Sequence, residues 1–253
     1  MPVDRSVLIA TANELLKPEM FSDYCPNGLQ VEGVQSISKL IAGVTACQAF
    51  IDRAVEEGAD AILVHHGFFW KGEDPTVVGM KYRRLRKLIE NGVNLIAYHL
   101  PLDAHPTLGN NALLADQLNI EITGGLEPGN PYSVGSIGRL NKPLSAERFG
   151  LVVAEALGRE PQVVEGGDHL IHTIAWCTGS AQGYIEQAAM AGADAYLSGE
   201  ISEPTVHSAR ELGVHYIAAG HHATERYGVQ GVGEYLAKQF NLEYAFIDID
   251  NPA

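Results

Sequence analysis

The sequence predicts an α/β protein made of two internally duplicated α/β/α halves with mixed sheets, and two observations predict it. From residue 40 onward, short apolar runs of strand length alternate with amphipathic segments of helix length. A Gly-Ala-Asp-Ala motif also occurs twice, at 58–61 and at 192–195. The alternation predicts a parallel or mixed sheet that helices cover on both faces. The duplication predicts that a pseudo-two-fold axis relates the two halves.

The first half is expected over residues 1–123. Apolar side chains recur at helical spacing up to about Pro18, and the segment 22–33 combines a turn with a strand. Strands and helices alternate after it. We expect strands over 39–46, 59–66 and 93–103, and helices over 47–58, 81–92 and 110–119.

The second half is expected over residues 171–253, and the segment 124–170 is expected to be an insert between the halves. The insert is rich in Gly and Pro at its start and contains a helix that Ser145 should cap. Its role is left open between a linker, a lid and a subunit contact. In the second half we expect strands over 173–179, 193–200, 214–222 and 242–249, and helices over 181–192, 202–213 and 223–240.

Composition places the chain among soluble globular proteins. Its 253 residues are 46% hydrophobic and 19% charged. The formal net charge of −14 argues against nucleic acid as a partner, because neutralising phosphates requires clustered Lys and Arg. The three cysteines lack CxxC spacing and are expected to be reduced. The chain shows no signal peptide and no apolar run of membrane-spanning length, so we expect a cytoplasmic protein without a membrane partner.

The duplication turns scattered polar residues into a predicted site. The segments 50–66 and 184–200 align, and so do 92–104 and 213–225. Each aligned segment includes the carboxyl end of a predicted strand, where open α/β folds bind their ligands. We therefore expect these four ends to surround one cleft. The polar side chains that they carry are His65, His66, His99, Asp103, Glu200, His221, His222 and Glu225.

These residue types predict a transition-metal site. Imidazole nitrogens and carboxylate oxygens together suit zinc, iron, manganese or nickel, whereas calcium and magnesium sites rarely use imidazole. His221 and Glu225 stand one helical turn apart, as a chelating pair requires. At a strand end that turns into a loop, His65 and His66 can diverge and serve two neighbouring ions. Five or more ligands exceed what one open tetrahedral ion needs, which favours a dinuclear centre.

Other polar residues receive different interpretations. His99 and His222 are left open between a direct ligand and a supporting residue. Asp60 and Asp194 precede the buried strand in each half, and their repetition predicts a turn or capping role. The remaining histidines lack comparable placement and are expected to be surface or structural residues: His105, His169, His172, His207 and His215.

Six segments of the chain resemble the NIF-three-like family, which is also labelled GTP cyclohydrolase 1 type 2-like. They are 22–33, 43–73, 99–112, 176–185, 198–211 and 218–226, so the resemblance extends over nearly the whole chain. It implies two intertwined α/β halves, a dinuclear metal centre and a ring-shaped homohexamer. It places the metal ligands on His65, His66, Asp103, His221 and Glu225, with Glu225 as the bridge.

The function predicted from site and resemblance together is that of a dinuclear divalent-metal-dependent hydrolase. Its substrate would be a small molecule, either GTP as for a cyclohydrolase or another nucleotide or phosphate-bearing compound. His99 and Glu200 are the candidate catalytic residues, which would accept a proton or orient the substrate. The alternative is a non-catalytic metal-binding scaffold whose ring displays a surface to partners. A closed coordination shell would favour that alternative.

Overall fold

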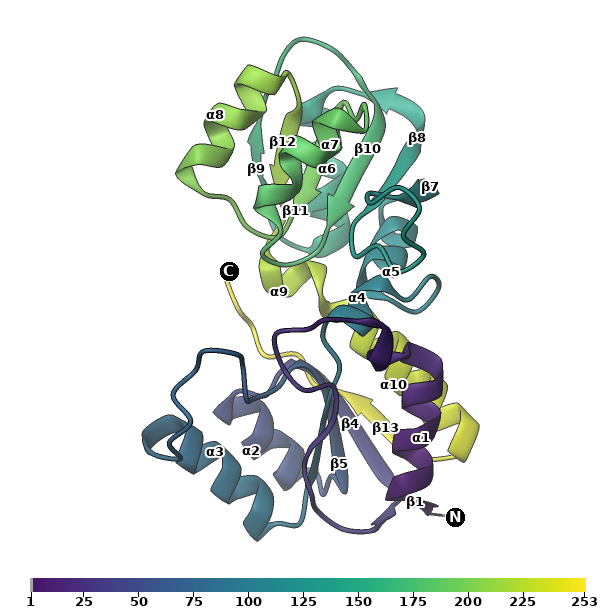
Figure 1. The fold of residues 1–253 in the computed structure, drawn as a ribbon, viewed down its shortest axis with the longest axis vertical. Helices are drawn as coiled ribbons and strands as arrows, with labels where there is room; N and C mark the ends of the chain where they lie inside the picture. The colour runs from purple at the N-terminus through teal and green to yellow at the C-terminus, as the bar shows by residue number, and fades with distance from the viewer. Residues whose placement is uncertain (1) are drawn as a thin grey trace. The chain divides into compact units, whose positions relative to one another are not determined.

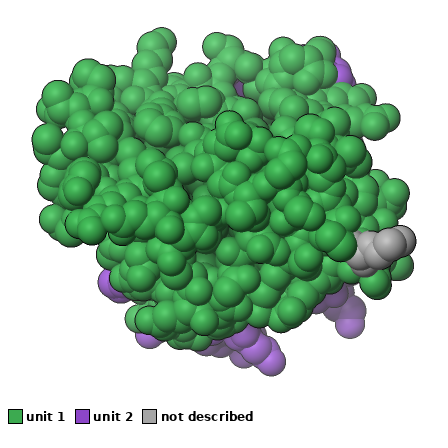
Figure 2. Space-filling model, turned by 90° about the horizontal axis from the view of Figure 1, so that it is seen from below, with its two compact units in different colours: residues 1–102, 228–250 green, residues 103–227, 251–253 purple. Residues whose placement is uncertain are grey.

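The computed structural model describes residues 2–253, which form two compact units. Unit 1 comprises residues 1–102 and 228–250, and unit 2 comprises residues 103–227 and 251–253. Each unit is thus assembled from separate stretches of the chain. Unit 1 is drawn in green in the space-filling view (Figure 2).

Unit 1 is built on a five-stranded mixed sheet with the order β13-β4-β5-β6-β2. The first four strands of this order run parallel, and the edge strand β2 runs antiparallel to β6. The strands are β2 (Gly28–Val31), β4 (Lys39–Thr45), β5 (Ala61–His66), β6 (Asn94–Ala97) and β13 (Glu243–Phe246).

Helices cover both faces of this sheet. The two sides of the sheet carry different helices (Figure 1). Helix α2 buries Phe50, Ile51 and Ala54, which share one face at helical spacing, against the apolar strand residues. The helices are α2 (Gln48–Glu56) and α3 (Gly79–Glu90) on one side, and α1 (Arg5–Leu16) and α10 (Arg226–Phe240) on the other; a 3-10 turn, η1 (Pro18–Met20), and a small sheet of β1 (Val3–Asp4) and β3 (Ser36–Ile37) complete the unit.

Unit 2 is built on a six-stranded mixed sheet with the order β7-β8-β10-β11-β12-β9. Its three central strands β10, β11 and β12 run parallel, and the flanking strands pair antiparallel. The strands are β7 (Ile120–Gly125), β8 (Ser136–Leu144), β9 (Gln162–Val164), β10 (Ile171–Cys177), β11 (Ala195–Ser198) and β12 (His215–Ala218).

Side chains of successive residues in the central strands of unit 2 point to opposite faces and form two cores. Ile174 and Trp176 pack in the cluster that contains α5 and α6, whereas Ala175 and Cys177 pack in the cluster that contains α7 and α8. The α/β/α layering predicted from the sequence is therefore observed. The helices are α4 (Leu100–Ala104), α5 (Asn110–Gln117), α6 (Ala146–Leu157), α7 (Ile185–Met190), α8 (Glu203–Leu212) and α9 (His221–Thr224), with the 3-10 turn η2 (Gln182–Tyr184) before α7.

The internal duplication is visible in the order of the elements. The series α1, β2, β4, α2, β5, α3, β6 in unit 1 is repeated as α6, β9, β10, α7, β11, α8, β12 in unit 2. In both sheets the second element of the series is an edge strand that pairs antiparallel with the last. The duplicated halves also exchange their final strands. Strand β7, which follows the first series, pairs with β8 of unit 2, and β13, which follows the second series, pairs with β4 of unit 1. The halves are thus intertwined.

This exchange corrects the expected division of the chain at residues 123 and 170. The segment 124–170 is not an insert, because β8, α6 and β9 are integral parts of unit 2. In topology α6 and β9 are the counterparts of α1 and β2. The expected halves fail at both ends because strands that pair are far apart in the sequence, and periodicity reports only local structure. Ser145 does cap α6, and its hydroxyl accepts a hydrogen bond from the amide of Arg148.

Asp60 and Asp194 hold three strands together in their respective units. The Asp194 carboxylate accepts the amides of His172 at 2.9 Å and Thr173 at 2.8 Å, and its carbonyl accepts the amide of His215 at 3.0 Å. The Asp60 carboxylate likewise accepts two amides at the start of β4, and its carbonyl accepts the amide of Asn94 in β6. The repeated aspartate therefore fixes the register of the strand before it and the strand after it.

We expect Asp194→Ala to destabilise unit 2 by about 1–3 kcal/mol, because two strand amides lose their acceptor. Urea unfolding followed by circular dichroism measures the change. The matched control is Asp168→Ala, which removes an exposed carboxylate in the loop before β10. An Asp194→Ala midpoint equal to that of the control would contradict the assigned role.

Within residues 2–253, no helix is both long enough and apolar enough to cross a membrane. The three cysteines are free, as their spacing predicted.

Candidate metal centre

His65 and His66 lie at the carboxyl end of β5 in unit 1. His65 is fully buried, and its Nδ1 lies 3.0 Å from the carbonyl oxygen of Tyr98. A carbonyl only accepts, so Nδ1 carries the proton and Nε2 of the neutral ring carries the lone pair that a metal needs. His66 is oriented by Thr45, whose hydroxyl lies 3.1 Å from Nδ1. The sequence thus places two imidazoles at one strand end, and backbone and hydroxyl contacts orient them.

His99 follows β6 and joins these two histidines. One ring nitrogen from each of His65, His66 and His99 lies within 4.8 Å of the others. The Nδ1 atom of His99 lies 2.6 Å from a carboxylate oxygen of Asp23, whose side chain is only 4% exposed. Burial alone would raise the pKa of Asp23, but hydrogen bonds from His99 and Asn27 outweigh it and hold the pKa below its usual value. Asp23 therefore stays ionised and orients His99.

Asp23 was not among the predicted site residues. It lies 76 residues before His99 in the sequence, in the loop after η1. Asp23 does lie in 22–33, one of the segments that carry the family resemblance, but no spacing in that segment points to a strand end. Cys25 in the same loop is buried, and burial together with the Asp23 charge raises its pKa to about 12. Donor atoms of Cys25, Asp23 and His99 also lie within 4.8 Å of one another, and the thiol is protonated as long as no cation is bound.

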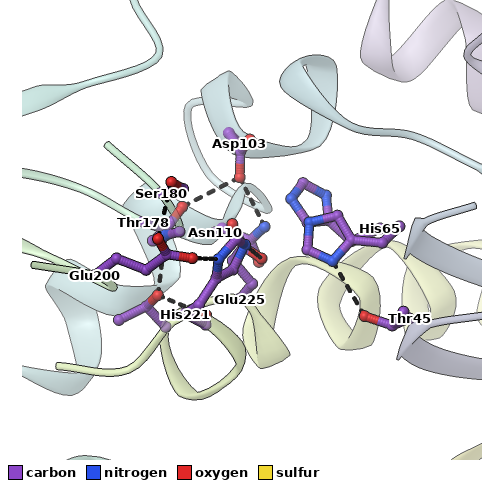
Figure 3. A network of polar contacts seen from close by, with 12 residues as sticks. Thr45, His65, Asp103, Asn110, Thr178, Ser180, Glu200, His221 and Glu225 are labelled. Carbon is purple, nitrogen blue, oxygen red and sulfur yellow. Dashed lines mark hydrogen bonds and ion pairs between the residues drawn. The ribbon is translucent and has the colours of Figure 1, made fainter. Parts of the chain in front are cut away.

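In unit 2, Asp103 lies in the short helix α4 and is 5% exposed. One of its carboxylate oxygens accepts hydrogen bonds from Nδ2 of Asn110 at 2.9 Å and from the Thr178 hydroxyl at 3.2 Å (Figure 3). Asn110 begins α5 and Thr178 follows β10. Two neighbouring elements thus fix the carboxylate in one orientation.

His221 and Glu225 occupy α9 and the residue after it, as their spacing predicted. The Nε2 atom of His221 lies 3.1 Å from a carboxylate oxygen of Glu225, which is 3% exposed. On the other side of the ring, Nδ1 lies 2.6 Å from one carboxylate oxygen of Glu200, whose other oxygen accepts the Ser180 hydroxyl at 3.1 Å (Figure 3). Burial would lower the pKa of His221, but the hydrogen bonds and charges of Glu225 and Glu200 outweigh it and raise the pKa to about 9.

Three glycines at the ends of the parallel strands make room for these groups. The amide of Gly199 donates to the carbonyl of Gly179, and the amide of Gly220 donates to the carbonyl of Gly199, both at 2.9 Å. A side chain at Gly179 would clash with a carboxylate oxygen of Glu225, and one at Gly199 would lie 2.6 Å from Cα of His221. Gly179 and Gly220 also adopt φ values of 68° and 99°, which favour glycine.

The other predicted residues fall into clear places. Glu200 contacts Nδ1 of His221, so it orients that ring. The amide of His222 donates to the carbonyl of Ala253 at 3.2 Å, and the ring belongs to none of the possible metal-binding groups in the described chain. The remaining histidines include His215, whose two ring nitrogens contact Gly166 and His169, and His207, which forms an exposed pair with Glu203.

The donor set of each unit fits a divalent cation. Carboxylate oxygens of Asp103 and Glu225 lie within 4.8 Å of each other, and both side chains are buried. Two buried carboxylates at this separation repel each other, and a cation between them reverses that repulsion. The three imidazoles of unit 1 and the carboxylates and imidazole of unit 2 are nitrogen and oxygen donors that suit transition metals rather than calcium or magnesium.

Comparisons with known proteins agree along the full chain. The sequence model of the family Duf34/NIF3 (NGG1p interacting factor 3) matches residues 3–252. A protein of Pseudomonas aeruginosa named GTP cyclohydrolase 1 type 2 homolog is 58% identical over 253 residues, 100% of both chains. A protein of Vibrio cholerae with the same name is 53% identical over 97% of this chain and 98% of its own. A solved structure described as protein ybgI, of unknown function, has a TM-score of 0.95 and 47% identity, covering 99% of this chain and 100% of that one.

Proposed function

Because the chain belongs to the Duf34/NIF3 family, we propose that it is a divalent-metal-dependent hydrolase that acts on a nucleotide or another phosphate-bearing small molecule. The observation that carries the proposal is the pair of buried carboxylates, Asp103 and Glu225, beside His221 in unit 2. Buried acidic groups with oriented hydrogen-bond partners are typical of metal ligands and are costly without a cation.

We assign five ligands to two ions, following the family resemblance. His65 and His221 would hold one ion, His66 and Asp103 would hold the other, and Glu225 would bind both. The assignment is supported by the contacts of four of these five side chains. In each of the four, another residue holds one polar atom of the side chain and so orients the ring or carboxylate. Tyr98, Thr45, Glu200 and Asn110 supply those contacts to His65, His66, His221 and Asp103, respectively.

Bound ions of this kind lower the pKa of a coordinated water and polarise the group that is attacked. The chain itself supplies the positioning and the proton transfer. His99 is the candidate proton acceptor, because its Nδ1 contacts Asp23 and its Nε2 is the ring nitrogen that could receive a proton. Glu200 fixes the ring of His221 and through it the position of a ligand nitrogen.

The reaction class is tested on two substrates of different chemistry. The name of the relatives, GTP cyclohydrolase 1 type 2 homolog, supports purine-ring opening, and phosphoester hydrolysis uses the same attacking water. Self-assembly into a homohexamer belongs to the same proposal through the family.

We expect purified protein to carry about two transition-metal ions per chain and to hydrolyse a phosphate-bearing substrate only when loaded. Elemental analysis gives the stoichiometry, and a panel of nucleotides with GTP included is followed by chromatography before and after chelation. Phe69→Ala changes an exposed residue of unit 1 outside the donor set. This variant controls for losses of metal or activity during purification and chelation. A chain that binds at most one ion, or binds two without turning over any compound of the panel, contradicts the dinuclear hydrolase; the second result favours a scaffold.

A further inference from the structure

Arg159 follows helix α6 in unit 2 and has a partly buried side chain. Gly158, with a φ of 69°, caps the C-terminal end of this helix, and Arg159 is the next residue. The Nη1 atom of Arg159 is buried, and within residues 2–253 it has no hydrogen-bond partner. A buried guanidinium nitrogen without a partner is costly, and an acceptor from outside the chain would remove that cost.

The guanidinium lies directly against Gly220, the residue before His221. A side chain at Gly220 would clash with Nη1 of Arg159 and would lie 2.8 Å from its Cδ and Cζ atoms. The absence of a side chain at Gly220 is therefore what admits the arginine. The charge of Arg159 therefore lies against the residue that precedes His221, a proposed metal ligand.

A second guanidinium lies at the other end of the same short segment. Arg226 follows Glu225 directly, and its Nη2 donates to the carbonyl of Leu157 at 2.8 Å. Leu157 ends α6, two residues before Arg159. Both arginines thus belong to the region where α6 ends; Arg226 donates to the backbone there, whereas Nη1 of Arg159 has no acceptor among residues 2–253.

The charge balance favours an anion at this place. The chain has a formal net charge of −14, so a substrate with phosphates is repelled by most of the surface. A positive group beside the donor set of unit 2 offsets that repulsion locally. The guanidinium also presents a planar fork that matches phosphate oxygens in pairs.

We infer that Arg159 binds a phosphate group of the substrate. This inference rests on the proposed function, which supplies the phosphate-bearing substrate, and it adds the residue that recognises it. Arg159 contacts the phosphate, and Gly220 positions Arg159.

The test measures the affinity of inorganic pyrophosphate by isothermal titration calorimetry, with metal-loaded and with metal-stripped protein. Arg159→Gln should weaken binding by about tenfold or more, because a charge-assisted pair of hydrogen bonds is lost. Arg159→Lys keeps the charge without the fork and should fall between Arg159→Gln and the wild type. Arg148→Gln, an exposed arginine on the same helix, is the matched control and should bind like the wild type.

Metal content and thermal melting are measured for every variant to separate binding from folding. Reduced pyrophosphate affinity of Arg159→Gln with wild-type metal content and melting supports the inference. Affinity within twofold of the wild type overturns it, and so does a parallel loss of metal, which would show that Arg159 acts through His221. Failure of the wild type to bind pyrophosphate in either state also overturns it. Failure of the proposed function appears elsewhere, as missing metal or missing turnover in the wild type.

Discussion

Glu225→Gln is expected to lower the occupancy of both metal ions, whereas His221→Ala leaves one ion largely bound. A bridging carboxylate holds two ions and partly neutralises two positive charges, so its loss weakens both sites. A terminal ligand serves only its own ion. Glu225 is 3% exposed, so water cannot take the place of the lost carboxylate oxygen in the variant. We expect the affinity of Glu225→Gln to fall by more than about a hundredfold, beyond the 10–100-fold typical of supporting residues.

Metal titration by calorimetry on metal-stripped protein measures both sites. Glu203→Gln is the matched control, because Glu203 and His207 form a glutamate–histidine pair four residues apart, as His221 and Glu225 do, but on an exposed helix surface. The control should bind two ions with wild-type affinity. If Glu225→Gln also keeps two ions at that affinity, the bridge is assigned to the wrong residue, and Glu200 becomes the better candidate.

Gly179→Ala is expected to weaken metal binding without any change to a ligand. The added methyl group would clash with a carboxylate oxygen of Glu225 and lie 3.1 Å from Nε2 of His221. Glu225 must therefore rotate away from the methyl group and lose its contact with His221. The φ of 68° at Gly179 adds roughly 1–2 kcal/mol of backbone strain for a residue with a side chain.

The readouts are metal affinity and the urea midpoint. Gly183→Ala is the matched control, because a methyl group there meets no atom within 4 Å and the backbone has no positive φ. We expect Gly179→Ala to lose at least a factor of ten in metal affinity, because Glu225 is misplaced. A factor of ten corresponds to about 1.4 kcal/mol of binding free energy. Wild-type affinity in Gly179→Ala together with a lowered urea midpoint would mean that the glycine serves only the backbone.

Much of the local structure follows from the sequence alone. The apolar run before His65 and His66 has strand length and strand composition, and β5 forms there. The spacing of His221 and Glu225 predicts one helical turn, and the two side chains lie 3.1 Å apart. Asp60 and Asp194 repeat in front of equivalent strands, and each accepts two amides of a neighbouring strand. These features depend on residues close together in the chain, so periodicity, spacing and repetition report them.

Only the tertiary structure decided which distant segments pair. Strands β7 and β13 join the sheet of the other half. Long-range packing determines this pairing and leaves no periodic signal in the sequence. For the same reason the expected insert 124–170 is an integral part of unit 2. The contact of Asp23 with His99 depends in the same way on a loop folding back across 76 residues. The roles of Gly179 and Gly220 are invisible in the sequence because they consist of an absent side chain, and only the surrounding atoms show what that absence admits.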